Sequence, residues 1–153
     1  VLEQCKEDDV IENVKAIREF AGDRAVLRAF HFFEENKRVD AEVEALEKKD
    51  FATFFNKITE SGDSSWKWLQ NCYCNETPDE QSITVALALT KLYLDKIGRG
   101  VCRVHGGGFA GVIAAFLPKE ETEGFTKYID KALGEGSAYV MHIRPQGAVK
   151  VEF

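Results

Sequence analysis

The sequence predicts an α+β fold in which a helical segment precedes a four-stranded antiparallel sheet of the split βαβ, ferredoxin-like, kind. Two observations lead to this prediction. Apolar residues recur at helical spacing through residues 1–98, whereas residues 99–153 contain short apolar runs bounded by glycine and proline. The order in the second part is β, β, α, β, β, with a glycine-rich turn between the first two strands. The hydrophobic share of 44% and the 11 phenylalanines supply a core, so we expect one lobe over residues 1–153.

The first two predicted helices are amphipathic. The first begins at Asp8 or Asp9, whose carboxylate caps it, and ends at Gly22. Its inward face is formed by Val10, Ile11, Val14, Ile17 and Phe20. The second begins at Asp23 and stops near Asp50. Its apolar positions are Phe30, Phe33, Val39, Val43 and Leu46.

Asp50 then caps a third helix, which we expect to end at Ser61–Asp63. The stretch Ser64–Asn75 is predicted to be helical, although the spacing of its two tryptophans also fits a strand. Thr77–Glu80 marks the start of a further helix, because proline suits the first turn and acidic groups favour the N-terminal end of the helix dipole. Its apolar stripe is Ile83, Ala86, Leu87, Thr90, Leu94 and Ile97, and a subdomain boundary is expected near Gly98.

The four strands are predicted from short apolar runs. Val101–His105 and Val112–Leu117 form the first pair. A helix from Pro118 to Leu133 follows, with Phe125, Tyr128, Ile129 and Leu133 facing inward. The last two strands are Ala138–Ile143 and Ala148–Val151, joined across Pro145–Gly147.

Composition and charge exclude several classes of protein. The formal net charge is −6, and no block of lysine or arginine forms a stripe that would follow a phosphate backbone, so we expect no nucleic-acid partner. No apolar run is long enough to cross a membrane, and the acidic start does not resemble a signal peptide, so the chain is predicted to be cytoplasmic. The four cysteines are expected to be reduced. Because the chain does not start with methionine, we expect a fragment of a longer protein.

The run His105–Gly111 is the stretch best suited to chemistry. Glycine reaches positive φ without a Cβ clash, so the main-chain N–H groups of such a run can turn toward a phosphate. The same freedom also serves a tight β-turn with close packing, and the residues alone leave both uses open.

Other candidates have a structural interpretation beside the functional one. We expect His31 to be packed and hydrogen-bonded, His142 to lie on a strand face, and His105 to be a possible cleft contact. Asp63 and the following serines either bind an anion or cap a helix. Cys72 and Cys74 lack the further ligands of a zinc site, so no metal is expected.

Several motifs in this order resemble the C-terminal half of a GHMP-type small-molecule kinase, most closely a galactokinase. Arg28–His31, with Glu34 and Arg38–Val39, is similar to the Arg-Ala-x-His helix of galactokinases. Phe51–Phe54, followed by Glu60–Ser61, is similar to the next helix of that family, and Arg103–Gly111 resembles its third motif. The likeness covers nearly the whole chain and implies the four-stranded sheet of that C-terminal domain.

The resemblance implies transfer of the γ-phosphoryl group of ATP to the anomeric hydroxyl of galactose, with Mg²⁺. In the family the sugar-recognition motif, the main phosphate loop and the catalytic residues precede this region, so we expect no catalytic residue in this chain and no activity of the chain alone. The resemblance assigns it a loop on the phosphate side of the cleft, Gly106, Gly107, Gly108, Phe109, Ala110 and Gly111, with His105 beside it. The missing N-terminal lobe is the expected partner. ATP, Mg²⁺ and galactose belong to the full-length enzyme, and the chain alone is expected to bind no cofactor.

The sequence departs from the family pattern in two places. His105 and Ala110 stand where many relatives have threonine and glycine, and Gly62 and Asp63 stand where relatives often have a histidine in a Ser-x-x-Ser turn. These changes leave the roles of His105 and Asp63 open. The alternative is a stand-alone ligand-binding or protein-interaction module of ferredoxin-like fold, because a fold does not fix a function.

Overall fold

The computed structural model describes residues 4–109, 111–143, 145–147 and 149–150. The chain divides into two compact units, Val1–Pro118 and Lys119–Phe153. Within the first unit, the helices are α1 (Glu7–Glu12), α2 (Val14–Ala21), α3 (Asp23–Glu47), α4 (Phe51–Ser64), the π-helix η2 (Ser65–Leu69) and α5 (Ser82–Ile97). The strands are β1 (Val101–Val104) and β2 (Ile113–Phe116). The second unit holds the 3₁₀-helix η3 (Lys119–Glu121) and α6 (Thr122–Leu133).

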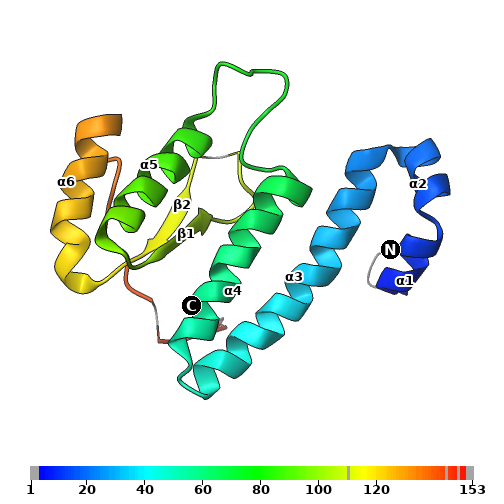
Figure 1. Ribbon diagram of the computed structural model, residues 1–153, viewed down its shortest axis with the longest axis horizontal. Coiled ribbons are helices and arrows are strands. Elements are labelled where there is room, and N and C mark those ends of the chain that lie inside the picture. The colour runs from blue at the N-terminus through cyan, green and yellow to red at the C-terminus, as the bar shows by residue number, and fades with distance from the viewer. Residues whose placement is uncertain (1–3, 110, 144, 148, 151–153) are drawn as a thin grey trace. The chain divides into compact units, whose positions relative to one another are not determined.

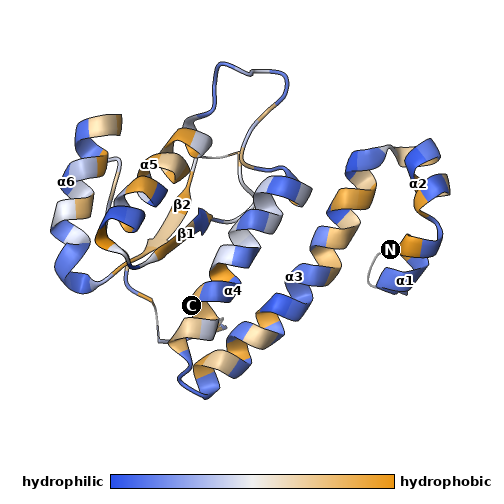
Figure 2. Ribbon diagram, viewed as in Figure 1, coloured by the Kyte–Doolittle hydropathy of each residue, from blue (hydrophilic) through white to orange (hydrophobic). Residues whose placement is uncertain are grey.

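The long helices α3 and α4 pack against each other, and β1 contacts both α4 and α5 (Figure 1). The strands form an antiparallel hairpin in which Val101 pairs with Phe116 and Val104 with Ile113. The two strands consist mainly of apolar residues (Figure 2). The core cluster beneath this hairpin consists of Cys72, Ile83, Leu87 and Val104, with Tyr73, Cys102 and Ile113 packed against it.

Gly62 explains how closely β1 approaches α4. A Cβ atom on Gly62 would lie 3.0 Å from the Cβ atom of Arg103 and 3.4 Å from the carbonyl oxygen of Cys102. The 3.0 Å contact is tighter than ordinary van der Waals packing, so a side chain at this position would require Arg103 to shift by a few tenths of an ångström. The prediction that the third helix ends at Ser61–Asp63 is wrong, because α4 runs to Ser64 and the chain continues directly into the π-helix η2.

The predicted four-stranded sheet is wrong. In the described part of the chain the only sheet is the pair β1–β2, and Ala138–Ile143 is not a strand. Ala148 and Val151 lie outside the described residues, and Val149 and Lys150 between them are not in a strand. An apolar run becomes a strand only when another strand hydrogen-bonds to it. Here the N–H group of Ala138 donates instead to a side chain of α6, the Oδ1 atom of Asp130, at 3.0 Å.

The first predicted helix is two helices, because the chain breaks at Asn13 between α1 and α2. The carboxylate of Asp9 accepts from the N–H group of Lys6 at 2.7 Å, and Gly22 ends α2 at φ 82°. The predicted inward face is partly wrong, since Val10 is buried but the Phe20 side chain is 95% exposed.

The second predicted helix is confirmed as α3, but its apolar positions near the C-terminal end are not covered. Val39, Val43 and Leu46 are 48%, 52% and 46% exposed. Periodicity shows that residues share a face of a helix, and burial additionally requires a neighbouring element, which this face lacks in the described part of the first unit.

The remaining helices follow the predictions more closely. Asp50 caps α4, with its Oδ1 atom accepting from the N–H group of Thr53 at 3.0 Å. The helix α5 begins at Ser82 rather than near Pro78, and its predicted stripe is confirmed at Ile83, Leu87, Thr90 and Leu94, all buried. In the second unit, η3 and α6 occupy the predicted helix, which ends before Gly134.

Candidate functional site

The glycine-rich run forms the turn of the β1–β2 hairpin. The N–H group of His105 donates to the carbonyl oxygen of Val112 at 3.0 Å, which extends the strand pairing by one step. Gly106, Gly108 and Gly111 have φ values of 66°, 72° and 83°, so three of the glycines occupy backbone conformations that other residues rarely adopt. Ala110, which the sequence analysis included in the loop, lies outside the described residues.

The middle of this loop, at Gly108 and Phe109, is tightly packed. A Cβ atom on Gly108 would lie 2.1 Å from the carbonyl oxygen of Asn71 and 2.8 Å from its Cβ and Cγ atoms. The next residue, Phe109, donates its N–H group to the same carbonyl at 3.1 Å. Phe109 also has a positive φ of 54°, although its side chain is 55% exposed. The loop is therefore fixed on the segment that follows the π-helix.

The beginning of the loop, at Gly106 and Gly107, is open. Among the described residues, no atom lies within 4 Å of the position a Cβ atom would take on Gly106 or on Gly107, and both residues are exposed, as is His105. A bare backbone beside open space gives an anion or another chain close access to main-chain N–H groups. The close packing considered from the sequence is thus present at Gly108, whereas the backbone at Gly106 and Gly107 is accessible. The functional roles of these residues stay a prediction.

Asn71, which the sequence does not single out, is 2% exposed. It follows Gln70, a left-handed residue with φ 56° that ends the π-helix η2. The guanidinium of Arg24, on α3, donates to the carbonyl oxygen of Gln70 at 2.9 Å. The Nδ2 atom of Asn71 is buried without a hydrogen-bond partner in the described part of the chain. The sequence shows only an asparagine beside Cys72, and the structure places that cysteine in the core.

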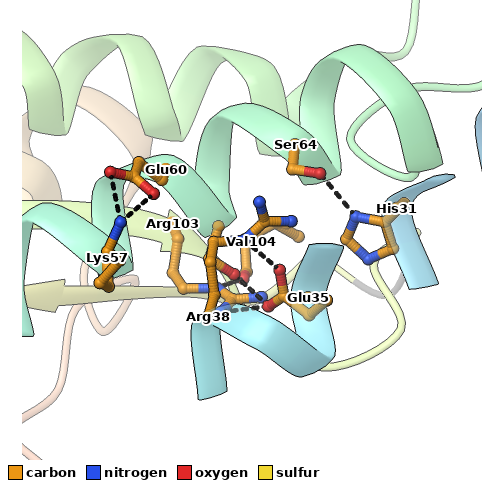
Figure 3. Close-up of polar contacts among 9 residues, drawn as sticks. His31, Glu35, Arg38, Lys57, Glu60, Ser64, Arg103 and Val104 are labelled. Atoms are coloured by element: carbon orange, nitrogen blue, oxygen red, sulfur yellow. Dashed lines mark hydrogen bonds and ion pairs between the residues drawn. The ribbon is translucent and has the colours of Figure 1, made fainter. Parts of the chain in front are cut away.

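A partly buried charge network lies where α3, α4 and β1 meet (Figure 3). The Oε2 atom of Glu35 accepts from the Nε atom of Arg38 at 2.9 Å, and its Oε1 atom accepts from the Nη1 atom of Arg103 at 3.3 Å. The hydroxyl of Ser61, which is fully buried, donates to the same oxygen of Glu35. Arg103 also donates from its Nε atom to the carbonyl oxygen of Val104 at 3.0 Å.

The electrostatics of this network favour an ionised Glu35. Burial raises the pKa of its carboxyl, but hydrogen bonds from Ser61 and Arg38 and the charge of Arg103 outweigh burial, so the pKa lies below its ordinary value. Burial raises the pKa of Glu42 as well, and there it outweighs the charges of Arg103 and Arg38, so that pKa lies above its ordinary value. Two arginines thus share one firmly ionised carboxylate, and the network holds β1 against both helices.

His31 belongs to the same region and behaves as the sequence predicts. Its Nδ1 atom lies 2.9 Å from the Oγ atom of Ser64, which is buried (Figure 3). Burial lowers the pKa of the imidazole, and the charges of Arg38 and Arg103 lower it further, while Glu35 raises it. The expected packed and hydrogen-bonded histidine is therefore confirmed.

The remaining candidates are dispersed. Asp63 pairs with Lys67 at 2.7 Å on the exposed side of the helix, and it does not cap one. Cys72 is buried and Cys74 is half-buried. Among the described residues, no three His, Cys, Asp or Glu side chains are grouped so as to hold a metal ion. A surface hollow at the start of α3 is lined by the charged residues Lys15, Arg18, Glu19 and Asp23. The structure has no helix, within its described residues, of the length and hydrophobicity needed to cross a membrane.

Comparison with known proteins relates the chain to one kind of enzyme. No protein-family model matches the chain, and no solved structure matches it significantly. Three curated galactokinases, from the Haemophilus influenzae strains PittGG, PittEE and KW20 / Rd, are each 30% identical to it over 146 aligned residues. The alignment covers 83% of this chain, and the chain spans about a third, 34%, of the length of these relatives. The similarity thus indicates a galactokinase-related fragment.

Proposed function

We propose that this chain is the C-terminal lobe of a galactokinase, an enzyme that transfers the γ-phosphoryl group of ATP to the anomeric hydroxyl of galactose. The similarity to curated galactokinases supports this proposal, as do the family motifs at Arg28–His31 and Arg103–Gly111. The observation that carries it is the geometry of the glycine-rich loop. The loop is anchored at Gly108 and Phe109 and leaves the backbone of Gly106 and Gly107 bare and accessible.

The proposal divides the work between two lobes. Phosphoryl transfer is catalysed mainly by positioning and by stabilising the charge on the transferred group. The chain contains no Gly-x-x-x-x-Gly-Lys-Ser/Thr motif, and its described residues include no group of three side chains suited to a metal ion. We therefore assign the catalytic groups and the Mg²⁺ ligands to the preceding lobe, and no step of the reaction to a metal held here.

The loop would contribute bare backbone to the cleft. Without side chains at Gly106 and Gly107, the phosphate loop of the other lobe, or the nucleotide phosphates themselves, can approach the main-chain N–H groups closely. A Cβ atom added at Gly107 would have no described residue within 4 Å, and the added side chain would project into that shared space. The loop therefore acts as a positioning surface, and its geometry depends on the anchored residues Gly108 and Phe109.

The first test is an isothermal titration of the 153-residue chain with Mg-ATP, with and without galactose, beside a coupled assay for sugar phosphorylation. We expect no saturable heat and no turnover, because a phosphate site shared by two lobes loses most of its donors when one lobe is absent. Turnover by this chain alone would refute the division between lobes. Saturable binding without turnover would favour a self-contained ligand-binding module.

The second test uses the parent enzyme that contains this chain. Gly107→Val should lower kcat by about 10- to 100-fold with little change in Tm, because the new side chain enters the cleft and not the core. Gly147→Val is the matched control, since a Cβ atom there also meets nothing within 4 Å but lies in the second unit. Normal turnover of the Gly107 variant would contradict the assigned role of the loop.

One observation favours a protein-interaction module instead. Val39, Val43 and Leu46 leave an apolar stripe on α3 about half exposed. An uncovered apolar face is typical of a docking surface, but a lobe separated from its partner would also expose one. The two interpretations differ in the coupled assay, because an interaction module would give no sugar phosphorylation even in the parent protein.

A further inference from the structure

The π-helix η2 is the least ordinary backbone feature of the first unit. α4 continues through Ser64 into the wider turn of Ser65–Leu69, and the chain then leaves the helix through the left-handed Gln70. Wide π-turns are rare and occur frequently at functional sites. A left-handed non-glycine residue costs free energy, so the surrounding structure must hold it in place. Arg24 does so, through its 2.9 Å hydrogen bond to the Gln70 carbonyl.

The consequence of this turn is the position of Asn71. Its carbonyl oxygen accepts from the N–H group of Phe109 at 3.1 Å, which ties the end of η2 to the glycine-rich loop. Its side chain lies directly against Gly108, where an added Cβ atom would be 2.8 Å from both the Cβ and the Cγ atom of Asn71. Backbone and side chain of one residue therefore contact two consecutive residues of the loop.

The side chain of Asn71 is not explained by hydrogen bonding within the core. Its Nδ2 atom is buried and has no partner among the described residues, and its Oδ1 atom receives only a weak contact from the Cys72 thiol at 3.8 Å. A buried amide without a partner lowers stability, so an apolar residue would suit this place better if packing alone mattered. The contact that remains is the one with Gly108.

We propose that Asn71 is a positioning residue for the glycine-rich loop, placed by the π-helix so that it fixes the loop at Gly108 and Phe109. Fixing these two residues determines where Gly106 and Gly107 present their backbone. The catalytic consequence rests on the proposed function, whereas the structural consequence does not. Asn71 acts through the loop and makes no contact with the reacting atoms.

Hydrogen exchange of the 153-residue chain tests the structural part. Asn71→Ala removes the side chain beneath Gly108, and we expect the Phe109 amide to exchange about tenfold faster relative to the amides of α5. Thr90→Ala is the matched control, because Thr90 is also fully buried and its hydroxyl also lacks a partner in the described structure. This control should leave the Phe109 amide unchanged relative to α5. Asn71→Leu, which refills the space, should restore protection of Phe109.

Kinetics of the parent enzyme test the catalytic part. We expect Asn71→Ala to lower kcat by about tenfold with the KM for galactose unchanged, and Thr90→Ala to leave kcat unchanged. Equal exchange at Phe109 in the two variants would overturn the inference, as would equal kcat values. If the wild-type parent phosphorylates no sugar, the proposed function fails, and the exchange comparison alone decides whether Asn71 positions the loop.

Discussion

Gly108→Ala should destabilise the first unit far more than Gly107→Ala, although the two residues are adjacent. At Gly108 the new Cβ atom would be 2.1 Å from the Asn71 carbonyl oxygen, so the loop must move by more than 1 Å to reach ordinary contact. That shift breaks the 3.1 Å hydrogen bond from Phe109, which contributes about 1 kcal/mol. The φ of 72° adds about 1–2 kcal/mol of backbone strain for alanine.

Together these effects predict a loss of about 2–3 kcal/mol for Gly108→Ala. Gly107→Ala has neither a close contact nor a left-handed φ, so its effect should lie within about 0.5 kcal/mol of zero. Urea unfolding of the two variants, followed by far-UV circular dichroism, measures the difference. Equal free energies of unfolding for the two variants would refute the packing of the loop described above.

Three further predictions concern the helices. Glu35→Ala should lower the free energy of unfolding by about 3–5 kcal/mol, because it leaves the buried guanidinium of Arg38 without its carboxylate; a value under 1 kcal/mol would contradict the network. Asp50→Ala should lower the free energy of unfolding by about 1 kcal/mol, because the Thr53 N–H group loses its cap, and Asp50→Asn should restore most of that loss. The third concerns His31, whose pKa is lower in the folded state than in the unfolded chain. The contribution of His31 to the free energy of unfolding is therefore present above about pH 6.5 and is lost as the pH falls through the folded pKa. The free energy of unfolding of a His31→Gln variant, measured against pH, should decline less steeply over that range.

The sequence predicts the fold well where a neighbouring element covers the face on which the apolar residues recur. The stripe of α5 is buried because the hairpin packs against it, and the change from helical to strand spacing near Gly98 marks the true start of β1. The run Ala138–Ile143 has a strand pattern as well, but a pattern cannot show whether a partner strand is available. Its residue Ile143 is 91% exposed, so the apolar side chains of this run are not evidence of a sheet.

The site shows the same limit at longer range. The glycine-rich loop was identifiable from its composition, because few other uses need so much bare backbone. The pairing of Glu35 with Arg103 joins residues 68 positions apart, and a glutamate on a charged helix is ordinarily a solvated residue. Asn71 could not be found either, because a π-turn has no periodic signal in the sequence and its effect depends on which segment it meets.

The charge network and the loop are connected through a single strand, and this connection argues that they act together. Arg103 binds Glu35 on one side and the carbonyl oxygen of Val104 on the other, and His105, two residues later, begins the loop. A strand of four residues has few hydrogen bonds of its own, so its position depends on what holds it from outside. The ionised Glu35 fixes β1 before the loop, and Asn71 fixes the loop after the open glycines. The exposed backbone at Gly106 and Gly107 therefore lies between two fixed points, one on β1 and one at Gly108.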